Sequence, residues 1–278
     1  MAKLSPFIPA HIARKIRGMT YGAKRQTCSI EGVKEAYSIG SPSGQRNGLI
    51  AYVGWTFKKS FVELIQSSGM GRVWVSGVPR LKNVIPERGD KFFFDNGAFL
   101  DWRNGSKLDL QRFFRDMDRL PKHCDWGVLP DVVGGGDASL ALSLRAIPDC
   151  RTDWDWYLAI QDNMTMERVA VAVVEHNIKG LFLGGTDKFK SEALSWASLA
   201  HTLGIKFHYG RAGTLRKVRY AKFVKSDSLD SSFPLWSVKR MEDFTAWITK
   251  EDGQTSLFAE RAGERAISQL TQNPTLDT

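Results

Sequence analysis

Short, nearly continuous apolar runs recur along the chain and predict strands that are buried on both faces. The runs are rich in β-branched, leucine and aromatic residues, and polar or glycine-rich turns separate them. The expected strands are Leu49–Val53, Val73–Ser76, Lys91–Phe94, Trp126–Leu129, Trp156–Ile160, Gly180–Leu183, Ile205–Tyr209 and Ala221–Val224.

Between most of these runs lie segments with the hydrophobic spacing of amphipathic helices. Asp137 and Thr165 are expected helix starts, because their side chains can accept a hydrogen bond from a free N–H group of the first turn. The second unit differs, since Gly77–Gly89 carries two prolines and predicts a loop. The expected helices are Leu108–Leu120, Ala138–Ala146, Thr165–His176, Ser191–Thr202 and Leu215–Tyr220.

Strands that alternate with helices predict right-handed βαβ units and an α/β fold with a parallel sheet. Eight such units match a (β/α)8 TIM barrel, with an open doubly wound sheet as the alternative. The chain has 278 residues, enough for one barrel domain. We expect the barrel over residues 49–278, ending in a helix at Leu257–Leu270 and a frayed tail. Residues 1–48 are expected to form a basic N-terminal extension packed on the barrel.

Charge points to a polyanionic partner. The chain has 39 Lys and Arg against 30 Asp and Glu, a formal net charge of +9, and no acid precedes Glu31. Nucleic acid is the usual partner of so basic a protein, although basic runs are also common on solvated surfaces. We find no apolar run of bilayer length and no secretory signal, which favours a cytoplasmic protein without a membrane partner. The three cysteines are scattered, which predicts neither a metal site nor a disulfide framework, and no motif calls for a cofactor.

Three aspartates, Asp95, Asp131 and Asp230, lie just after predicted strands. The loops at the carboxyl ends of barrel strands carry the chemistry of such folds, because a rigid scaffold positions them. A single acid at a strand end is more often a helix cap or a loop residue. Three at equivalent positions predict a site.

The segment Phe92–Phe94 followed by Asp95-Asn-Gly-Ala-Phe99 resembles the Asp-Ser-Gly-Gly-Phe/Tyr signature of the tRNA-guanine transglycosylase superfamily. Five further segments occur in the order and at the spacing of that family, and the resemblance covers about residues 50–235. These segments are Leu129-Pro-Asp131, Ala159-Ile-Gln-Asp162, Leu183-Gly-Gly-Thr186, His208-Tyr-Gly-Arg-Ala-Gly213 and Asp227-Ser-Leu-Asp230.

The resemblance implies a base exchange that leaves the polynucleotide backbone intact, in which guanine is replaced by a 7-deazaguanine. The chemistry is similar to that of a retaining glycosidase, with a covalent glycosyl-enzyme intermediate. The family pattern assigns Asp230 as the nucleophile and Asp95 as the general acid and base. Asp227 is the alternative nucleophile, because it lies closer to the expected eighth strand. His208 is expected to pack inward.

The resemblance also implies how the base is held. Asp131 and Gln161 would hydrogen-bond its Watson–Crick edge, and a backbone N–H at Gly184–Gly185 would meet its carbonyl. Phe99 and Tyr209 would stack on its two faces. The simpler interpretations are a polar turn at Gln161, a tight turn at the two glycines and ordinary core packing of the two aromatic residues.

Departures from the family favour DNA over tRNA as the substrate. Bacterial tRNA enzymes carry clustered zinc-binding cysteines after the last strands, whereas this chain has no cysteine beyond Cys150, and no appended RNA-binding domain is expected. The chain therefore resembles the phage and bacterial branch that inserts 7-deazaguanines into DNA, in the host cytoplasm for a phage-encoded enzyme. The expected free base is 7-cyano-7-deazaguanine. Asn96, Ala98 and Thr186 differ from the family where the 7-substituent is expected.

Base exchange requires the target nucleotide to leave the stack, so phosphate-binding cations should surround the site. The same residues could be ordinary helix-surface charges. Alternatives to DNA base exchange are exchange on RNA, a non-catalytic nucleic-acid-binding barrel and a small-glycoside hydrolase. The oligomeric state is open, and a monomer is consistent with the sequence. The candidate cations are Arg211, Arg216, Lys217 and Lys225, together with Arg219, Lys222, Lys239 and Arg240.

Overall fold

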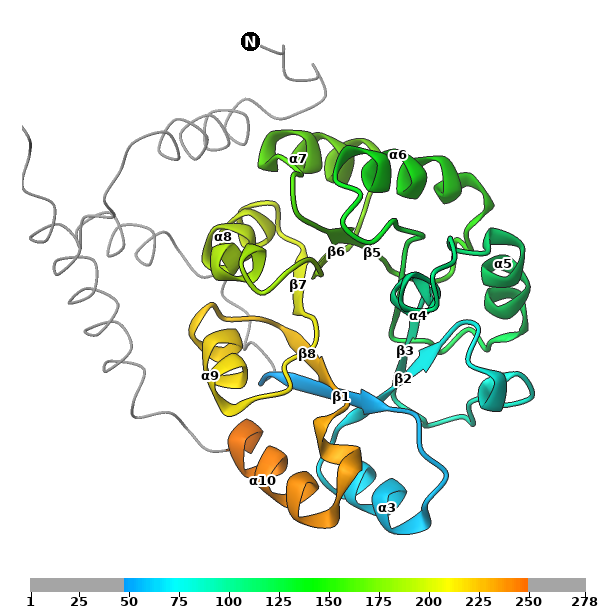
Figure 1. Cartoon of the computed structure of the whole chain (residues 1–278), viewed down its shortest axis with the longest axis vertical. Helices are drawn as coiled ribbons and strands as arrows, with labels where there is room; N and C mark the ends of the chain where they lie inside the picture. The colour runs from blue at the N-terminus through cyan, green and yellow to red at the C-terminus, as the bar shows by residue number, and fades with distance from the viewer. Residues whose placement is uncertain (1–47, 250–278) are drawn as a thin grey trace, which may run out of the picture.

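Eight parallel strands pair in chain order, and the last pairs back with the first, in the computed structural model, which describes residues 48–249. Figure 1 shows the strands around a central axis with most of the helices in a ring outside them. The closed barrel confirms the (β/α)8 fold and excludes the open doubly wound sheet. The N-terminal extension and the helix expected at Leu257–Leu270 lie outside the described residues. The strands are β1 (Ile50–Gly54), β2 (Gly71–Val75), β3 (Phe92–Asp95), β4 (Trp126–Val128), β5 (Trp156–Ile160), β6 (Gly180–Leu183), β7 (Lys206–Tyr209) and β8 (Ser228–Ser231).

Helices follow most strands. The connection after β2 contains only the 3₁₀ turn η1 (Pro79–Leu81), as its two prolines predict. No helix within residues 48–249 has the length and apolar character needed to cross a membrane. The helices are α3 (Lys59–Ser67), α4 (Ala98–Arg103), α5 (Leu110–Arg119), α6 (Asp137–Ala146), α7 (Met166–Glu175), α8 (Ala193–Thr202), α9 (Leu215–Phe223) and α10 (Val238–Thr249), and the other 3₁₀ turns are η2 (Ile147–Asp149), η3 (Phe189–Glu192) and η4 (Phe233–Trp236).

Helix starts follow local capping chemistry. Thr165 caps α7 as predicted, because its side chain accepts a hydrogen bond from the Arg168 N–H. Asp137 does not cap α6 but is its first residue, and the preceding Gly136 occupies the cap position. The backbone of Gly136 has φ +49° and ψ −121°, a conformation that is open to glycine and strained for other residues.

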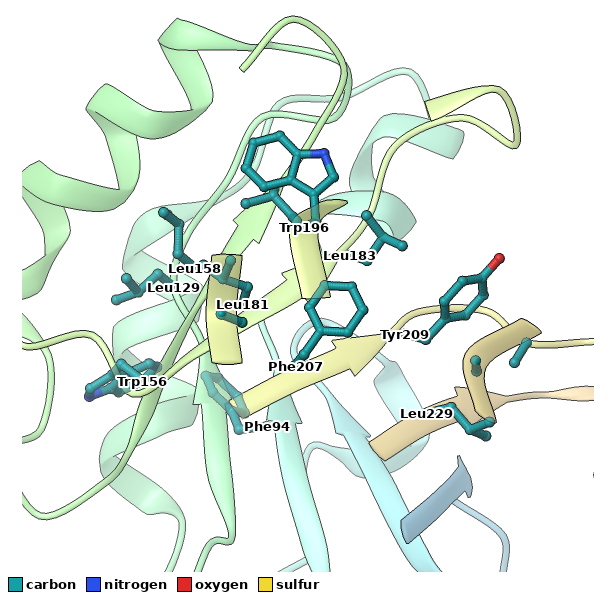
Figure 2. Packing of buried hydrophobic residues seen from close by; sticks show 14 of the residues in the cluster. Phe94, Leu129, Trp156, Leu158, Leu181, Leu183, Trp196, Phe207, Tyr209 and Leu229 are labelled. Carbon is teal, nitrogen blue, oxygen red and sulfur yellow. The ribbon is translucent and has the colours of Figure 1, made fainter. Parts of the chain in front are cut away.

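The core has two layers, because successive side chains of a strand point to opposite sides. Inside the barrel, Trp126 stacks between Phe93 and Tyr157, with ring centroids 4.0 and 4.2 Å apart. Between the strands and the helices lies a larger apolar cluster that includes Phe207 and Tyr209, as Figure 2 shows. The aromatic rings fill the barrel interior, so any polar side chains at its C-terminal end lie next to apolar groups.

The expected eighth strand at Ala221–Val224 is wrong. Those residues belong to α9 and the residue that caps its end, since Thr214 starts a helix that buries Val218 and Ala221 one turn apart. The true strand, β8, begins at Ser228, four residues after the end of the expected one, and has few apolar side chains. Its inward residues are Ser228 and Asp230, so hydrophobicity does not mark it. Asp230 therefore lies within β8 and not in the turn after it.

Candidate active site

Four polar side chains from different strands meet at the C-terminal end of the barrel. Asp95 is the last residue of β3 and Asp230 the third residue of β8, while Asp131 and Gln161 occupy the turns after β4 and β5. Their electrostatic interactions show their proximity, because the charge of Asp230 raises the pKa of Asp95 and that of Asp95 raises the pKa of Asp131. The structure brings together the four residues that the sequence singled out.

Asp230 is held as a carboxylate. Its Oδ1 accepts hydrogen bonds from His208 Nε2 and from the Arg211 backbone N–H, both at 3.0 Å. Burial alone would raise the pKa of Asp230, but these two donors and the charge of Lys190 outweigh it and hold the pKa below its ordinary value. Within residues 48–249, Oδ2 accepts no hydrogen bond, so one oxygen of an ionised carboxylate is left to react.

His208 orients the Asp230 carboxylate from the barrel interior. It is fully buried among the aromatic rings of the barrel interior, as expected, and burial lowers its pKa against the opposing effect of Asp230. A neutral imidazole carries one N–H, and Asp230 requires it on Nε2. Nδ1 then accepts from the Ser228 hydroxyl at 2.8 Å. The Ser228–His208–Asp230 chain fixes the tautomer as well as the position of the ring.

Asp95 differs from Asp230 in that its pKa is raised and not lowered. Burial, followed by the charge of Asp230, raises its pKa to about 6, although a 2.8 Å hydrogen bond from the Gly97 N–H acts in the other direction. Asp95 can therefore hold or release a proton near neutral pH. Two carboxylates at one mouth, one kept ionised and one easily protonated, are the arrangement that acid–base and nucleophilic roles require.

Asp131 lies at the centre of a buried amide network. Its Oδ1 accepts from Asn96 Nδ2 at 2.7 Å, and its Oδ2 accepts from Gln161 Nε2. Burial raises the pKa of Asp131 to about 7. Gln161 is no solvated turn residue, since it is buried and its Oε1 accepts from the Gly134 N–H at 2.6 Å. The network places a carboxylate, bonded to two side-chain amides, beside Asp95 and Asp230.

The two glycines after β6 have different roles. The Gly184 N–H is bonded to the carbonyl of Ile160 at 3.0 Å. The Gly185 N–H donates to no acceptor within residues 48–249, and this leaves it as the candidate donor to a bound base. Gly185 has φ +72°, and a Cβ there would lie 2.6 Å from the ring of Phe189 and 2.7 Å from Asp162 Oδ2. Asp162 also accepts both the N–H and the hydroxyl of Thr186, so it ties the turns after β5 and β6 together.

Only one of the two expected stacking residues is available. Phe99 is 41% exposed on α4, and the guanidinium carbon of Arg211 lies 4.8 Å from its ring centroid. Tyr209 is 2% exposed and lies in the layer between barrel and helices (Figure 2). The expectation that Tyr209 stacks on a base is therefore wrong. His208 points into the barrel, so its neighbour Tyr209 must point away from it.

Lys190 is a buried amine that sequence reasoning missed. It lies in η3, its Nζ donates to the carbonyl of Gly210, and it lies 5.3 Å from the ring centroid of Tyr209. Burial and the charge of Arg211 lower its pKa to about 7, while Asp230 opposes the shift. Through Gly210, Lys190 fixes the turn in which Arg211 adopts φ +57° and directs its N–H at Asp230.

The expected phosphate-binding cations do not form one group. Arg211 lies over the mouth, and Arg216 is exposed in the first turn of α9. Lys217 is paired with Asp187 at 2.8 Å. Lys225 follows α9 and precedes β8, so it lies at the opposite end of the barrel, and its expected role at the site is wrong.

Asp227 also lies at that opposite end. Its carboxylate accepts from Lys206 Nζ and from the Phe207 N–H, both at 2.9 Å, and it lines a cavity of about 230 Å³ there with Tyr52 and Trp126. Burial opposes its ionisation, but these partners and His201 lower its pKa to about 2. Asp227 therefore does not share the mouth with Asp95. Among residues 48–249, no three His, Cys, Asp or Glu side chains group as metal ligands.

Comparisons with known proteins find only solved structures of low similarity. No family model and no curated protein sequence matches the chain. Solved structures that resemble it include a native KDPGal structure, with 14% identity over 81% of this chain and 98% of that one and a TM-score of 0.47. An HpcH/HpaI aldolase from Desulfitobacterium hafniense has 9% identity over 89% and 98% of the two chains and a TM-score of 0.43. A 3-hexulose-6-phosphate synthase from Salmonella typhimurium has 10% identity over 73% and 98% and a TM-score of 0.41. Similarity at this level does not bear on function.

Proposed function

We propose that the protein is a DNA-guanine transglycosylase that exchanges guanine in DNA for a 7-deazaguanine base through a covalent bond to Asp230. The observation that carries the proposal is the pair of carboxylates at the barrel mouth whose pKa values are shifted in opposite directions. The pKa of Asp230 is held low and that of Asp95 is raised to about 6. A nucleophile must be ionised and a general acid protonated, and this pair meets both needs over one pH range.

The reaction has two displacements at C1′ of the target nucleotide. Asp230 Oδ2 attacks C1′, the bond between C1′ and the base nitrogen breaks, and Asp95 gives its proton to the departing guanine. The incoming 7-deazaguanine then loses the proton on its N9 to the Asp95 carboxylate. Its N9 attacks C1′ and displaces Asp230. Two inversions give net retention and leave the phosphodiester bonds intact.

The amide network beside the carboxylates suits a guanine-like base. Such a base presents two N–H donors on its Watson–Crick edge, and Asp131 supplies two acceptor oxygens braced by Asn96 and Gln161. Adenine would place an unprotonated ring nitrogen against the same carboxylate, and an unpaired buried polar group is costly. The free Gly185 N–H is available for the base carbonyl, and Phe99 for one face of the ring.

The DNA substrate and the 7-cyano group rest on the family resemblance together with the net charge of +9. The test is the incorporation of radiolabelled guanine into DNA and, in parallel, into tRNA, by wild type and Asp230→Asn. We expect label in DNA that Asp230→Asn abolishes. Label in tRNA alone would show that the substrate is RNA and not DNA. No label in either polymer, with binding unaffected by Asp230→Asn, would favour a non-catalytic nucleic-acid-binding barrel. A second assay with unlabelled 7-cyano-7-deazaguanine as competitor tests the incoming base.

A further inference from the structure

Large exposed apolar side chains gather at the mouth of the barrel. Seven occur among residues 48–249, and all but Ile85 lie within about seven residues of the carboxyl end of the preceding strand. The segments concerned follow β8, β1, β3 and β4, which adjoin one another around the barrel except for β2 between β1 and β3. The segments after β5, β6 and β7 have none. The six residues are Phe57, Phe99, Trp102, Val132, Trp236 and Val238.

Two aromatic surfaces occur in this arc, which we call the α4 ledge and the η4 ledge: the first is a pair of stacked rings, and the second is formed by Trp236 and Phe233 with Arg240 over both rings, while Phe233 also stacks on Trp247 at 5.1 Å. In the α4 ledge, Phe99 and Trp102 stack at 5.6 Å, and Trp102 is 56% exposed. In the η4 ledge, Trp236 is 70% exposed beside Phe233, and the guanidinium carbon of Arg240 lies 4.6 Å from the Trp236 ring and 5.0 Å from that of Phe233.

Both ledges are close in sequence to one of the two aspartates at the mouth, and the α4 ledge is anchored to α5. The α4 ledge begins four residues after Asp95, and Asp101 of the same helix accepts two hydrogen bonds from Arg112 of α5, at 3.0 and 2.6 Å. The η4 ledge begins three residues after Asp230. The ledges therefore lie on the two sides of the pair of carboxylates and are separated by the segments after β1 and β2.

We propose that the two ledges hold the unpaired nucleotides on either side of the target guanosine, so that the enzyme engages single-stranded DNA. This rests on the proposed function for the identity of the polymer. Exposed aromatic rings with arginine beside them are the usual platform for successive bases of a single strand. In a duplex the neighbouring bases stay stacked on each other and offer no free face. Arg211 and Arg240 provide the positive charge that the phosphates of the strand require.

The α4 ledge also places the target base. Arg211 covers one face of Phe99 in this structure, and Trp102 lies on the same aromatic stack. A guanine that enters the mouth takes the place of the guanidinium on Phe99, and Arg211 then exchanges its hydrogen bond to the Gly185 carbonyl for one to a phosphate. Trp102 is then available to the next base.

The test is binding of a fluorescent oligonucleotide with one guanine, as a single strand and as a duplex, measured by anisotropy. We expect wild type to prefer the single strand. Trp102→Ala and Trp236→Ala should each weaken single-strand binding by roughly 5- to 150-fold, which corresponds to about 1–3 kcal/mol for one stacked base. Trp236→Phe should retain most of the affinity. Ile85→Ala is the matched control, because Ile85 is 52% exposed but lies in the connection between η1 and β3, outside both ledges, and it should bind as wild type does.

Equal binding of single strand and duplex, or unchanged binding in both tryptophan variants, would overturn the proposal. A change in oligomeric state in place of a change in DNA binding would assign the ledges to a second copy of the chain. The binding test of the ledges and the incorporation test of base exchange can fail independently. Binding that depends on the tryptophans without incorporation of label contradicts the enzymatic function, whereas incorporation without that dependence contradicts only the ledges.

Discussion

His208 controls the acidity of Asp230, and its replacement by leucine should change the pH dependence of the enzyme. The substitution removes the Nε2–H donor that Asp230 Oδ1 accepts at 3.0 Å. A hydrogen bond to a charged group is worth about 1.5–3 kcal/mol, and 1.36 kcal/mol is about one pKa unit. The pKa of Asp230 should therefore rise by about 1 to 2 units. The donor from the Arg211 backbone remains, so the carboxylate stays in place.

The assay is kcat for guanine exchange at saturating DNA as a function of pH, because kcat reports ionisations in the bound complex, where the N–H donors of the base hold Asp131 as a carboxylate. The acidic limb of kcat/KM would also report the pKa of about 7 of Asp131 in the free protein. The proposed reaction needs ionised Asp230, so its rate should fall as the pH falls through the pKa of that group. A higher pKa moves this acidic limb to higher pH by the same 1 to 2 units. His208→Gln can still donate to Asp230 and should move the limb less. His176→Leu, at an exposed position after α7, should leave the profile unchanged. An unchanged acidic limb in folded His208→Leu would refute the role of the imidazole.

Three further predictions follow from the site. Asp95→Asn should lower the exchange rate by about 10²- to 10⁴-fold and abolish the fall of wild-type kcat/KM above about pH 6, because it removes the acid whose pKa lies there; a retained basic limb would contradict this. Gly185→Ala should lower the free energy of unfolding in urea by more than Gly204→Ala. Both have a left-handed backbone, which costs an alanine about 1–2 kcal/mol, but only a Cβ at Gly185 meets other atoms within 4 Å; equal losses would contradict the steric argument. Lys190→Met should flatten the pH dependence of stability. The folded pKa of Lys190 is about 7, below that of the unfolded chain, so wild-type stability should rise between about pH 7 and pH 10, by up to 1.36 kcal/mol per unit; an unchanged slope in the variant would assign the titration to another group.

Much of the barrel could be predicted from hydrophobicity, because seven of its strands fall in largely apolar runs of sequence. The eighth could not, since β8 turns Ser228 and Asp230 inward and has an apolar pattern weaker than the last turn of α9. Asp137 shows a similar limit. Although Asp137 is a good capping residue, it is the first residue of α6, because Gly136 can adopt the unusual backbone conformation found at the cap position.

The polar cluster was predicted from the order of its motifs, whereas its support depends on packing. Lys190 lies in a Lys-Phe-Lys segment that is typical of a solvated surface, and its burial follows from contacts between the turns after β6 and β7. Asn96 was noted only as a departure from the family, although it braces Asp131. The alternation of β7 could have excluded Tyr209, because His208 and Tyr209 cannot both face the mouth.

The central claim is that Asp230 forms a covalent bond to the sugar, and trapping that adduct tests it most directly. Enzyme, a guanine-containing oligonucleotide and no incoming base would be mixed, denatured and resolved on a gel, with mass spectrometry of the shifted band. We expect an adduct on Asp230 in wild type and in Asp227→Asn, whose carboxylate lies at the other end of the barrel. Asp230→Asn should give none. An adduct that persists in Asp230→Asn, or that Asp227→Asn abolishes, would contradict the account.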